Sequence, residues 1–291
     1  MSLPPSELVL NPDNSVYHLG LHPKDIADTI LLVGDPGRVR LVSDKFDRVT
    51  LRQQKREFIT HTGELNGKRL TVMATGIGTD NIDIVLNELD ALVNIDLEKR
   101  EYKDEKKSLR LIRMGTSGSL QSDIPVDSIL LSEAALGFDG VLHFYDAEHI
   151  MDHGFMEAFR NEINWPVAAA HPYLVRADKE VLDLLRGDNT YTGVTITAHG
   201  FYGPQGRELR IPIAMPYLND KLEDFRYGNE RITNYEMETS ALYGLGKLMG
   251  HRCCTACVII ANRPNNDFSA NYHAAVERMI DHILKCLTER S

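Results

Sequence analysis

Apolar residues along this chain gather in short runs that stop at glycine turns. Thr29-Ile-Leu-Leu-Val33 stops at Gly34-Asp-Pro-Gly37, and Arg69-Leu-Thr-Val-Met-Ala74 stops at Thr75-Gly-Ile-Gly78. Short apolar runs bounded by glycine and proline are typical of buried strands. The pattern therefore predicts two buried strands, each ending in a turn.

Between and after these runs, apolar residues recur at helical spacing. This predicts an amphipathic helix over 80–96 and a closing helix over 272–287, because the apolar positions in each fall on one face. Other helices are expected to begin within 39–44 and to span 178–187 and 234–249, and other strands to span 109–114, 126–132, 191–198 and 255–261.

Alternation of strands and helices predicts the fold class. Parallel strands need crossover connections, which place helices on both faces of the sheet. We expect an α/β fold, a single domain over residues 1–291 with a central mixed, largely parallel β-sheet flanked by helices. Residues 97–108 carry dense charge of both signs, so they are expected to form a charged insertion or an extension of the preceding helix.

The composition limits the kinds of partner that the protein is expected to bind. The formal net charge is −10, which gives no general attraction to nucleic acid or to an anionic membrane surface. No run of about 18 apolar residues is present, and the first residues do not resemble a secretory leader, so we expect a cytoplasmic protein. An anionic ligand would need local arginines.

The sequence lacks the motifs of several common classes of enzyme and metal site. Cys254 and Cys257 form a lone C-x-x-C with no second pair, so a packed structural role is favoured over metal binding and no metal is predicted. Thr75-Gly-Ile-Gly78 lacks the third glycine of a dinucleotide fingerprint. Walker, H-E-x-x-H and G-x-S-x-G motifs are also missing.

Two segments carry candidate chemistry. Arg113-Met-Gly-Thr-Ser-Gly118 offers a guanidinium and hydroxyls for a phosphate, and Asn234-Tyr-Glu-Met-Glu-Thr239 offers carboxylates for a sugar diol. Each has a plainer explanation: one arginine can form a surface ion pair, and glutamates favour the first turn of a helix. The combination indicates a nucleoside ligand.

The chain resembles the first nucleoside phosphorylase family, and within it the members that act on uridine. Eight motifs carry the resemblance, in family order from residue 16 to residue 263: Val16-Tyr-His-Leu-Gly-Leu21, Gly34-Asp-Pro-Gly-Arg-Val39, Lys55-Arg-Glu-Phe-Ile-Thr60, Thr75-Gly-Ile-Gly78, Arg113-Met-Gly-Thr-Ser-Gly118, Phe201-Tyr-Gly-Pro-Gln-Gly-Arg207, Asn234-Tyr-Glu-Met-Glu-Thr239 and Val258-Ile-Ile-Ala-Asn-Arg263.

The resemblance implies a role for each matching residue and an active site shared between two subunits. It assigns phosphate to Gly34, Arg38, Arg113 and Thr116, with Arg56 from the neighbour; ribose to Glu236, Met237 and Glu238, with His18 from the neighbour; and the base to Phe201, Gln205, Arg207 and Arg263. Arg113, Thr116, Gln205 and Arg207 would act directly on the reaction.

The implied reaction is reversible phosphorolysis of uridine to uracil and ribose 1-phosphate. Phosphate is a co-substrate, and no organic cofactor is implied. Purine-cleaving relatives place an aspartate near the purine ring, whereas the chain has Ala261-Asn-Arg263 there, which favours a pyrimidine. Alternatives are another nucleoside, hydrolysis, a catalytically silent nucleoside-binding protein on the same fold or, more distantly, a dinucleotide-dependent oxidoreductase.

The chain departs from the family pattern in three places. Asp80 follows the second glycine turn, where it is expected to cap the next helix. Ala74 replaces a serine implicated in a monovalent cation site, so the sequence does not support such a site. Phe138 to Pro172 match no motif, which leaves dimer and hexamer both open.

Overall fold

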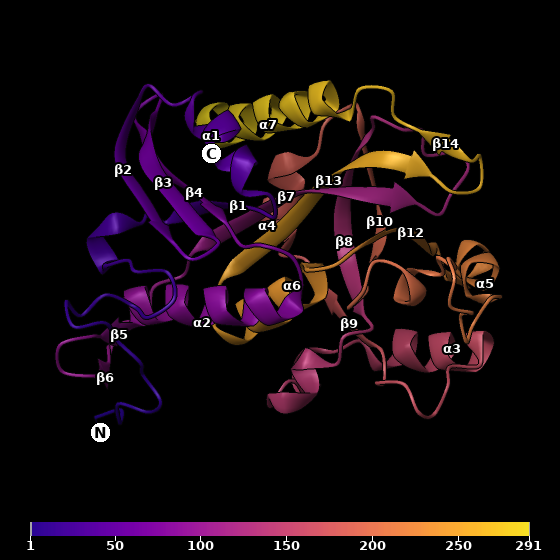
Figure 1. Cartoon of the computed structure of the whole chain (residues 1–291), viewed down its shortest axis with the longest axis horizontal. Coiled ribbons are helices and arrows are strands. Elements are labelled where there is room, and N and C mark those ends of the chain that lie inside the picture. The colour runs from indigo at the N-terminus through magenta and orange to yellow at the C-terminus, as the bar shows by residue number, and fades with distance from the viewer. Residues whose placement is uncertain (1, 291) are drawn as a thin grey trace.

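The computed structural model describes residues 2–290, and a twelve-stranded β-sheet runs through the middle of them with helices on both faces (Figure 1). The strands of this sheet are β1 (Thr29–Val33), β2 (Arg48–Lys55), β3 (Phe58–Leu65), β4 (Lys68–Ala74), β7 (Arg110–Ser119), β8 (Ile129–Gly137), β9 (Tyr173–Arg176), β10 (Thr190–Thr197), β11 (Arg226–Tyr227), β12 (Glu230–Glu236), β13 (Arg252–Asn262) and β14 (Asp267–Phe268).

The sheet is mixed, with parallel pairs at its centre. β1 pairs in parallel with β4 and β7, β13 with β7, and β10 with both β8 and β12. β12 also pairs antiparallel with β7, where Tyr235 lies opposite Gly118. This last pairing brings the end of β12 back alongside the end of β7. The predicted α/β fold with a mixed, largely parallel sheet is confirmed.

Two layers of helices cover the sheet. One layer contains α1 (Pro36–Ser43), α4 (Lys179–Leu185) and α7 (Tyr272–Glu289), and the other contains α2 (Thr79–Asn94), α3 (His153–Ile163), α6 (Thr239–Leu248) and the short α5 (Leu218–Asp224). Figure 1 shows α1 and α7 on one side of the sheet and α2 and α6 on the other. Over residues 2–290, no helix is both long enough and apolar enough to cross a bilayer.

The apolar stripes predicted for α2 and α7 face the core. Ile82, Val85 and Leu89 of α2 are fully buried, as are Met279 and Ile283 of α7. Each such side chain contributes roughly 1.5–3 kcal/mol when it leaves water. Their helical spacing is thus the main reason why these two segments were predictable.

The helix predicted over 234–249 is wrong in its first part. Residues Glu230–Glu236 form β12, and α6 begins only at Thr239. Asn234 and Tyr235 pair with β7, and Glu236 pairs with Thr197 of β10. Pairing with two neighbouring strands therefore keeps these residues extended, although the helical pattern includes them.

The edge of the sheet was not predicted. β2 and β3 form a hairpin, and β2 alternates exposed and half-buried residues without an apolar run. α2 ends at Asn94, and the charged segment after it continues into a small hairpin of β5 (Ile95–Asp96) and β6 (Glu101–Tyr102). Residues 97–108 therefore do not extend α2.

Candidate active site

A cavity of about 700 Å³ lies where the ends of β1, β7, β12 and β13 meet the segment after β10. It collects most of the predicted site residues, namely Gly34, Arg38, Arg113, Thr116, Phe201, Gln205, Arg207, Glu236, Met237 and Glu238. After the ligands expected from the sequence, we call Gly34, Arg38, Arg113, Thr116 and Glu238 the phosphate–ribose wall, and Phe201, Gln205 and Arg207, with Arg263 behind Gln205, the base wall.

Arg113 is the buried centre of the phosphate–ribose wall. Its Nη2 donates to Glu238 Oε2, and its Nη1 lies 3.4 Å from Glu236 Oε2. Burial by itself would lower the pKa of Arg113, but the two carboxylates outweigh burial and raise it. Its Nε is buried without a hydrogen-bond partner. The guanidinium is therefore held charged and in one orientation.

Glu238 is the carboxylate nearest to that guanidinium and is itself buried. Its Oε1 accepts a hydrogen bond of 2.9 Å from the backbone N–H of Gly78. Burial raises the pKa of Glu238 to about 7, Arg113 opposes this shift, and Glu236 adds to it. A carboxyl group with such a pKa can exist in both protonation states near neutral pH.

The carboxylate of Glu236 is occupied by hydrogen bonds within the protein. Its carboxylate accepts from Thr197 Oγ1 at 2.5 Å, from the Glu238 N–H at 2.9 Å and from the Thr239 N–H at 3.0 Å. These backbone donors belong to the start of α6, which a carboxylate stabilises. Glu236 thus fixes the end of β12 against the start of α6 and so positions Glu238.

The glycine turns lie beside this wall. A Cβ atom built on Gly34 would lie 3.4 Å from the carbonyl oxygen of Gly76, so the turns after β1 and β4 are in contact. Gly78 has a φ of 100°, a conformation that favours glycine, and occupies the N-cap position of α2. The predicted cap by Asp80 is wrong, because α2 begins at Thr79 and Asp80 is exposed in its first turn.

Arg38 adds a second guanidinium to this wall. It lies in the first turn of α1, and burial lowers its pKa; the charge of Asp35 opposes this shift, and the charge of Arg113 adds to it. Within residues 2–290, Arg38 forms no ion pair with a carboxylate, and Thr116 lines the same cavity. This part of the site therefore favours an anion.

The base wall is held by a network around Gln205. Gln205 Oε1 accepts from Arg207 Nη1 at 2.6 Å and from Arg263 Nη2 at 3.3 Å, while Arg207 Nη1 also donates to the carbonyl oxygen of Phe201 at 2.6 Å. Among residues 2–290, the Gln205 Nε2 has no acceptor. This amide is therefore oriented with a free donor.

Positive charge on the base wall has no carboxylate partner in the described chain. Burial lowers the pKa of Arg207, and burial together with Arg207 lowers the pKa of Arg263 to about 10. Their guanidinium groups lie over aromatic rings instead, Arg207 at 3.9 Å from the centroid of Phe201 and Arg263 at 4.9 Å from that of Tyr235. Such a wall would stabilise negative charge on a ligand.

Three predicted residues do not line this cavity. Arg263 lies behind Gln205, and its Nη1 donates to the Gln205 carbonyl oxygen at 2.5 Å. The His18 Nδ1 lies 2.6 Å from Glu88 Oε1, and the exposed Arg56 lies over Tyr17, 5.6 Å from its ring centroid. Within this chain, His18 and Arg56 therefore lie together around Tyr17, and neither lines the cavity.

Other residues of the cavity were not predicted to belong to the site. Glu57, Ile77, Asn81 and Phe268 line it. Phe268 reaches it because β14 pairs antiparallel with the end of β13. Residues 264–267, just before Phe268, are rich in proline and asparagine, which favour turns, and this pattern could have predicted the hairpin.

The structure describes no metal centre. In the 2–290 range, no three His, Cys, Asp or Glu side chains are grouped so as to hold an ion. All four cysteines are buried and free. Burial raises the pKa of Cys257 to about 12, which keeps it a neutral thiol, in agreement with the packing role predicted for these side chains.

Comparison with known families identifies the class of protein. Residues 28–288 match the family described as the phosphorylase superfamily. The match covers most of the chain and includes every candidate site residue except His18. The chain therefore belongs to the phosphorylase superfamily.

Individual relatives are similar over nearly their whole length. A uridine phosphorylase of Thermococcus kodakarensis is 28% identical over 94% of this chain and 87% of that protein. A DeoD-type purine nucleoside phosphorylase of Listeria welshimeri is 26% identical over 81% and 82%. The crystal structure of a Trypanosoma brucei nucleoside phosphorylase that shows uridine phosphorylase activity has a TM-score of 0.87 and 28% identity, over 96% of this chain and 99% of that one.

Proposed function

We propose that this protein is a uridine phosphorylase, a pentosyltransferase that reversibly converts uridine and phosphate into uracil and ribose 1-phosphate. The observation that carries the proposal is the base wall: Gln205 and Arg207 line the cavity, Arg263 donates to Gln205 from behind, and among the described residues none of them forms an ion pair with a carboxylate. Uridine phosphorylases and a structure with that activity are among the relatives of the chain.

The two walls fit the charges of the reaction. Breaking the bond between sugar and base develops positive charge on the sugar and negative charge on the departing base. Phosphate held by Arg38, Arg113 and Thr116 would place an anion beside the sugar and act as the nucleophile. Arg207 and the free Nε2 of Gln205 would donate to the oxygens of uracil as it leaves.

The end of β13 supports a pyrimidine over a purine. Asn262 is buried, and its Nδ2 donates to the carbonyl oxygens of Gln121 and Ile124 at 2.9 and 2.8 Å. Ala261 and Arg263 flank it, so the end of β13 offers no carboxylic acid that could protonate a purine ring. The relatives include both substrate classes, and these residues favour uridine.

Two guanidinium groups support phosphorolysis over hydrolysis. Arg38 forms no salt bridge among residues 2–290, although the charge of Asp35 acts on it, and Arg113 is kept charged by its buried carboxylates. Attack by water would need neither group. The retained pair is therefore the feature that a phosphate nucleophile requires.

We further infer that the active site is completed by a second copy of the chain. Arg56 and His18 do not line the cavity of their own chain, and unlike Arg263, which bonds to Gln205, both sit around Tyr17. A two-fold dimer could present this surface to the partner's cavity. Arg56 would then reach phosphate, and His18 would reach the sugar.

A nucleoside panel assayed with and without phosphate tests the proposal. We expect uridine to release uracil only when phosphate is present, with inosine and adenosine cleaved much more slowly. Equal release of uracil without phosphate would indicate a hydrolase. Preference for a purine nucleoside, or binding without turnover, would contradict the proposed substrate or the proposed activity.

A further inference from the structure

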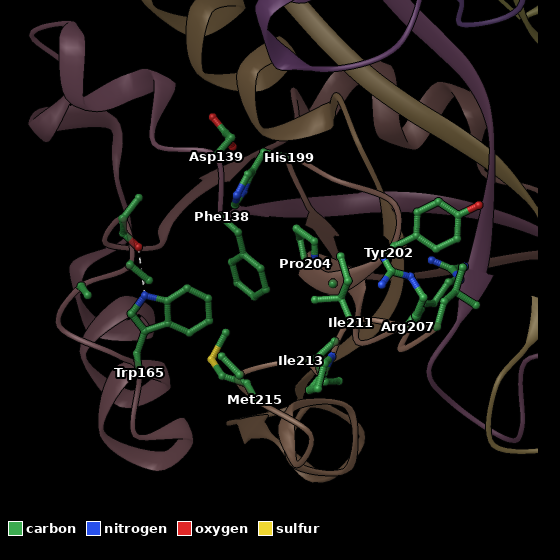
Figure 2. A pocket seen from close by; sticks show the side chains of 18 residues that line it. Phe138, Asp139, Trp165, His199, Tyr202, Pro204, Arg207, Ile211, Ile213 and Met215 are labelled. Atoms are coloured by element: carbon green, nitrogen blue, oxygen red, sulfur yellow. Dashed lines mark hydrogen bonds between the residues drawn. The ribbon is translucent and has the colours of Figure 1, made fainter.

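A second cavity of about 840 Å³ lies beside the base wall (Figure 2). Its sides come from the residues directly after β8, from the segment between α3 and β9 and from the segment between β10 and α5. Most of the lining is apolar, with Phe138, Trp165, Pro204, Ile211, Ile213 and Met215 pointing into the space. We call it the aromatic cavity.

The aromatic cavity has the dimensions of a ligand site. Ligand cavities usually measure about 300–1,000 Å³ and combine an apolar lining with a few polar groups. The rings of Phe138 and Trp165 are tilted at 46° with their centroids 4.5 Å apart. Trp165 Nε1 donates to the Ala170 carbonyl oxygen at 2.9 Å, so its polar atom is satisfied. These rings can contact a flat apolar molecule.

The charged groups on the lining select the sign of that molecule. Arg207 and Arg210 line the aromatic cavity, and within residues 2–290 neither forms an ion pair with a carboxylate. Asp139 lines it too, but its carboxylate already accepts from Tyr173 Oη at 2.7 Å and from Ser240 Oγ at 2.7 Å. The lining therefore holds two guanidinium groups against one carboxylate, and this excess of positive charge suits an anionic group.

Arg207 lines both the candidate active site and the aromatic cavity. We propose that the aromatic cavity binds a planar aromatic anion, and that its occupancy weakens binding of the nucleoside base because both ligands draw on the Arg207 guanidinium. The second half of this proposal rests on the proposed function. Such coupling is reciprocal, so each ligand must weaken the other by the same factor.

The probe for the first half is 8-anilinonaphthalene-1-sulfonate, an aromatic anion that fluoresces in apolar surroundings. Trp165 is the single tryptophan of the chain, so energy transfer from it reports a probe bound nearby. We expect saturable, one-to-one sensitised emission. Trp165→Phe should remove the sensitised emission but leave the directly excited fluorescence.

Two matched variants locate the probe. Ile211 lines the cavity and is 72% exposed, so Ile211→Asp should fold normally yet weaken probe binding at least about tenfold by placing a carboxylate beside the sulfonate. Leu41→Asp, on α1 and 41% exposed, should bind the probe like the wild type. Equal affinity in both variants would overturn the site.

Arg210→Ala tests the role of charge. We expect it to weaken probe binding about fivefold, as loss of a partly exposed ion pair should, and to leave uridine turnover unchanged. Unchanged probe affinity would contradict the proposed recognition of the anion.

Uridine without phosphate tests the coupling. Its addition should raise the apparent Kd of the probe to a plateau, because the ligands occupy different cavities. A Kd that rises without limit would place the probe in the active site, and a Kd that uridine leaves unchanged would refute the coupling. A protein that binds the probe here but never releases uracil from uridine would contradict the proposed function alone.

Discussion

The two walls of the candidate active site are built in different ways. The phosphate–ribose wall stands on strand ends, and its central guanidinium, Arg113, is buried between two carboxylates. Most of the base wall stands on the irregular segment after β10, where Gln205 is buried but Phe201 is 50% exposed and lies under Arg207. The central cation of the first wall is part of the core, whereas that of the second is half-buried beside an exposed ring.

Because of this difference, a substitution in one wall should affect stability and activity differently from a substitution in the other. A charge buried in an ion pair supports the fold as well as ligand binding, because its loss leaves the partner charge unpaired in the interior. The half-buried guanidinium of Arg207 donates to a carbonyl oxygen and to an amide oxygen. If it is removed, water can take its place, so the loss of unfolding free energy should be small. We therefore expect substitutions on the phosphate–ribose wall to lower both stability and activity, and substitutions on the base wall to lower activity alone.

The largest effect is expected for Arg113→Ala. Glu236 and Glu238 would be left in the interior without their counter-charge, which costs roughly 3–5 kcal/mol of unfolding free energy. Loss of the phosphate contact should lower kcat/KM for uridine by at least about a thousandfold. Denaturant unfolding and steady-state assays measure both quantities.

The control for Arg113→Ala is Arg231→Ala. Arg231 pairs with Asp123 at the surface, at 2.7 Å, so its removal should cost less than about 1 kcal/mol. If the two variants lost the same unfolding free energy, the buried ion pairs of Arg113 would not support the fold more than a surface ion pair does.

Arg207→Ala should affect activity alone. Loss of a donor to the departing base predicts a fall in kcat/KM of about a hundredfold, with the unfolding free energy changed by less than about 0.5 kcal/mol. Arg210→Ala, three residues later in the same segment, is the matched control and should retain activity. A stable Arg207→Ala variant with wild-type turnover would disprove the role of the base wall.

Glu238 predicts a pH dependence of stability. Its pKa is about 7 in the folded protein against 4.5 ordinarily, so between these pH values the folded state holds a proton that the unfolded state has released. Stability from this group is therefore full below about pH 4.5 and is lost as pH rises through 7, by at most about 1.4 kcal/mol per pH unit. Glu238→Gln cannot titrate. Its unfolding free energy should accordingly lack this decline, and parallel profiles for the two proteins would refute the pKa argument.

The smallest predicted signal tests the sharing of the site between subunits. In the proposed dimer, each site takes Arg207 from one chain and Arg56 from the other. A mixed dimer of Arg56→Ala and Arg207→Ala chains therefore has one site with both arginines and one site with neither. Random reassortment of the two inactive variants should restore about a quarter of wild-type activity. No recovery after verified subunit exchange would mean that Arg56 acts in its own chain or not at all.

The sequence could predict those parts of the fold that bury regular apolar patterns. β1, β4, α2 and α7 place their apolar residues in the core, and burial is what selects such patterns. β12 could not be read in the same way, because Asn234–Glu236 are kept extended by pairing with β7 and β10. Tertiary pairing overrode the local helical signal there.

The candidate site shows the same limit. Motif order gathered the residues that now line one cavity, including Arg113, Glu238 and Arg207. Motifs could not show that the Glu236 carboxylate is used by backbone N–H groups, or that Phe268 enters from a hairpin. Both facts depend on the path of the chain, which a residue pattern does not specify.

Phosphorus NMR of a reaction with uridine and inorganic phosphate shows whether the bond to the base is broken by phosphate. We expect the signal of ribose 1-phosphate to grow in equal amount with uracil, and the reaction to reverse when both products are supplied. Uracil released together with free ribose, while the phosphate signal stays constant, would contradict the proposed phosphorolysis.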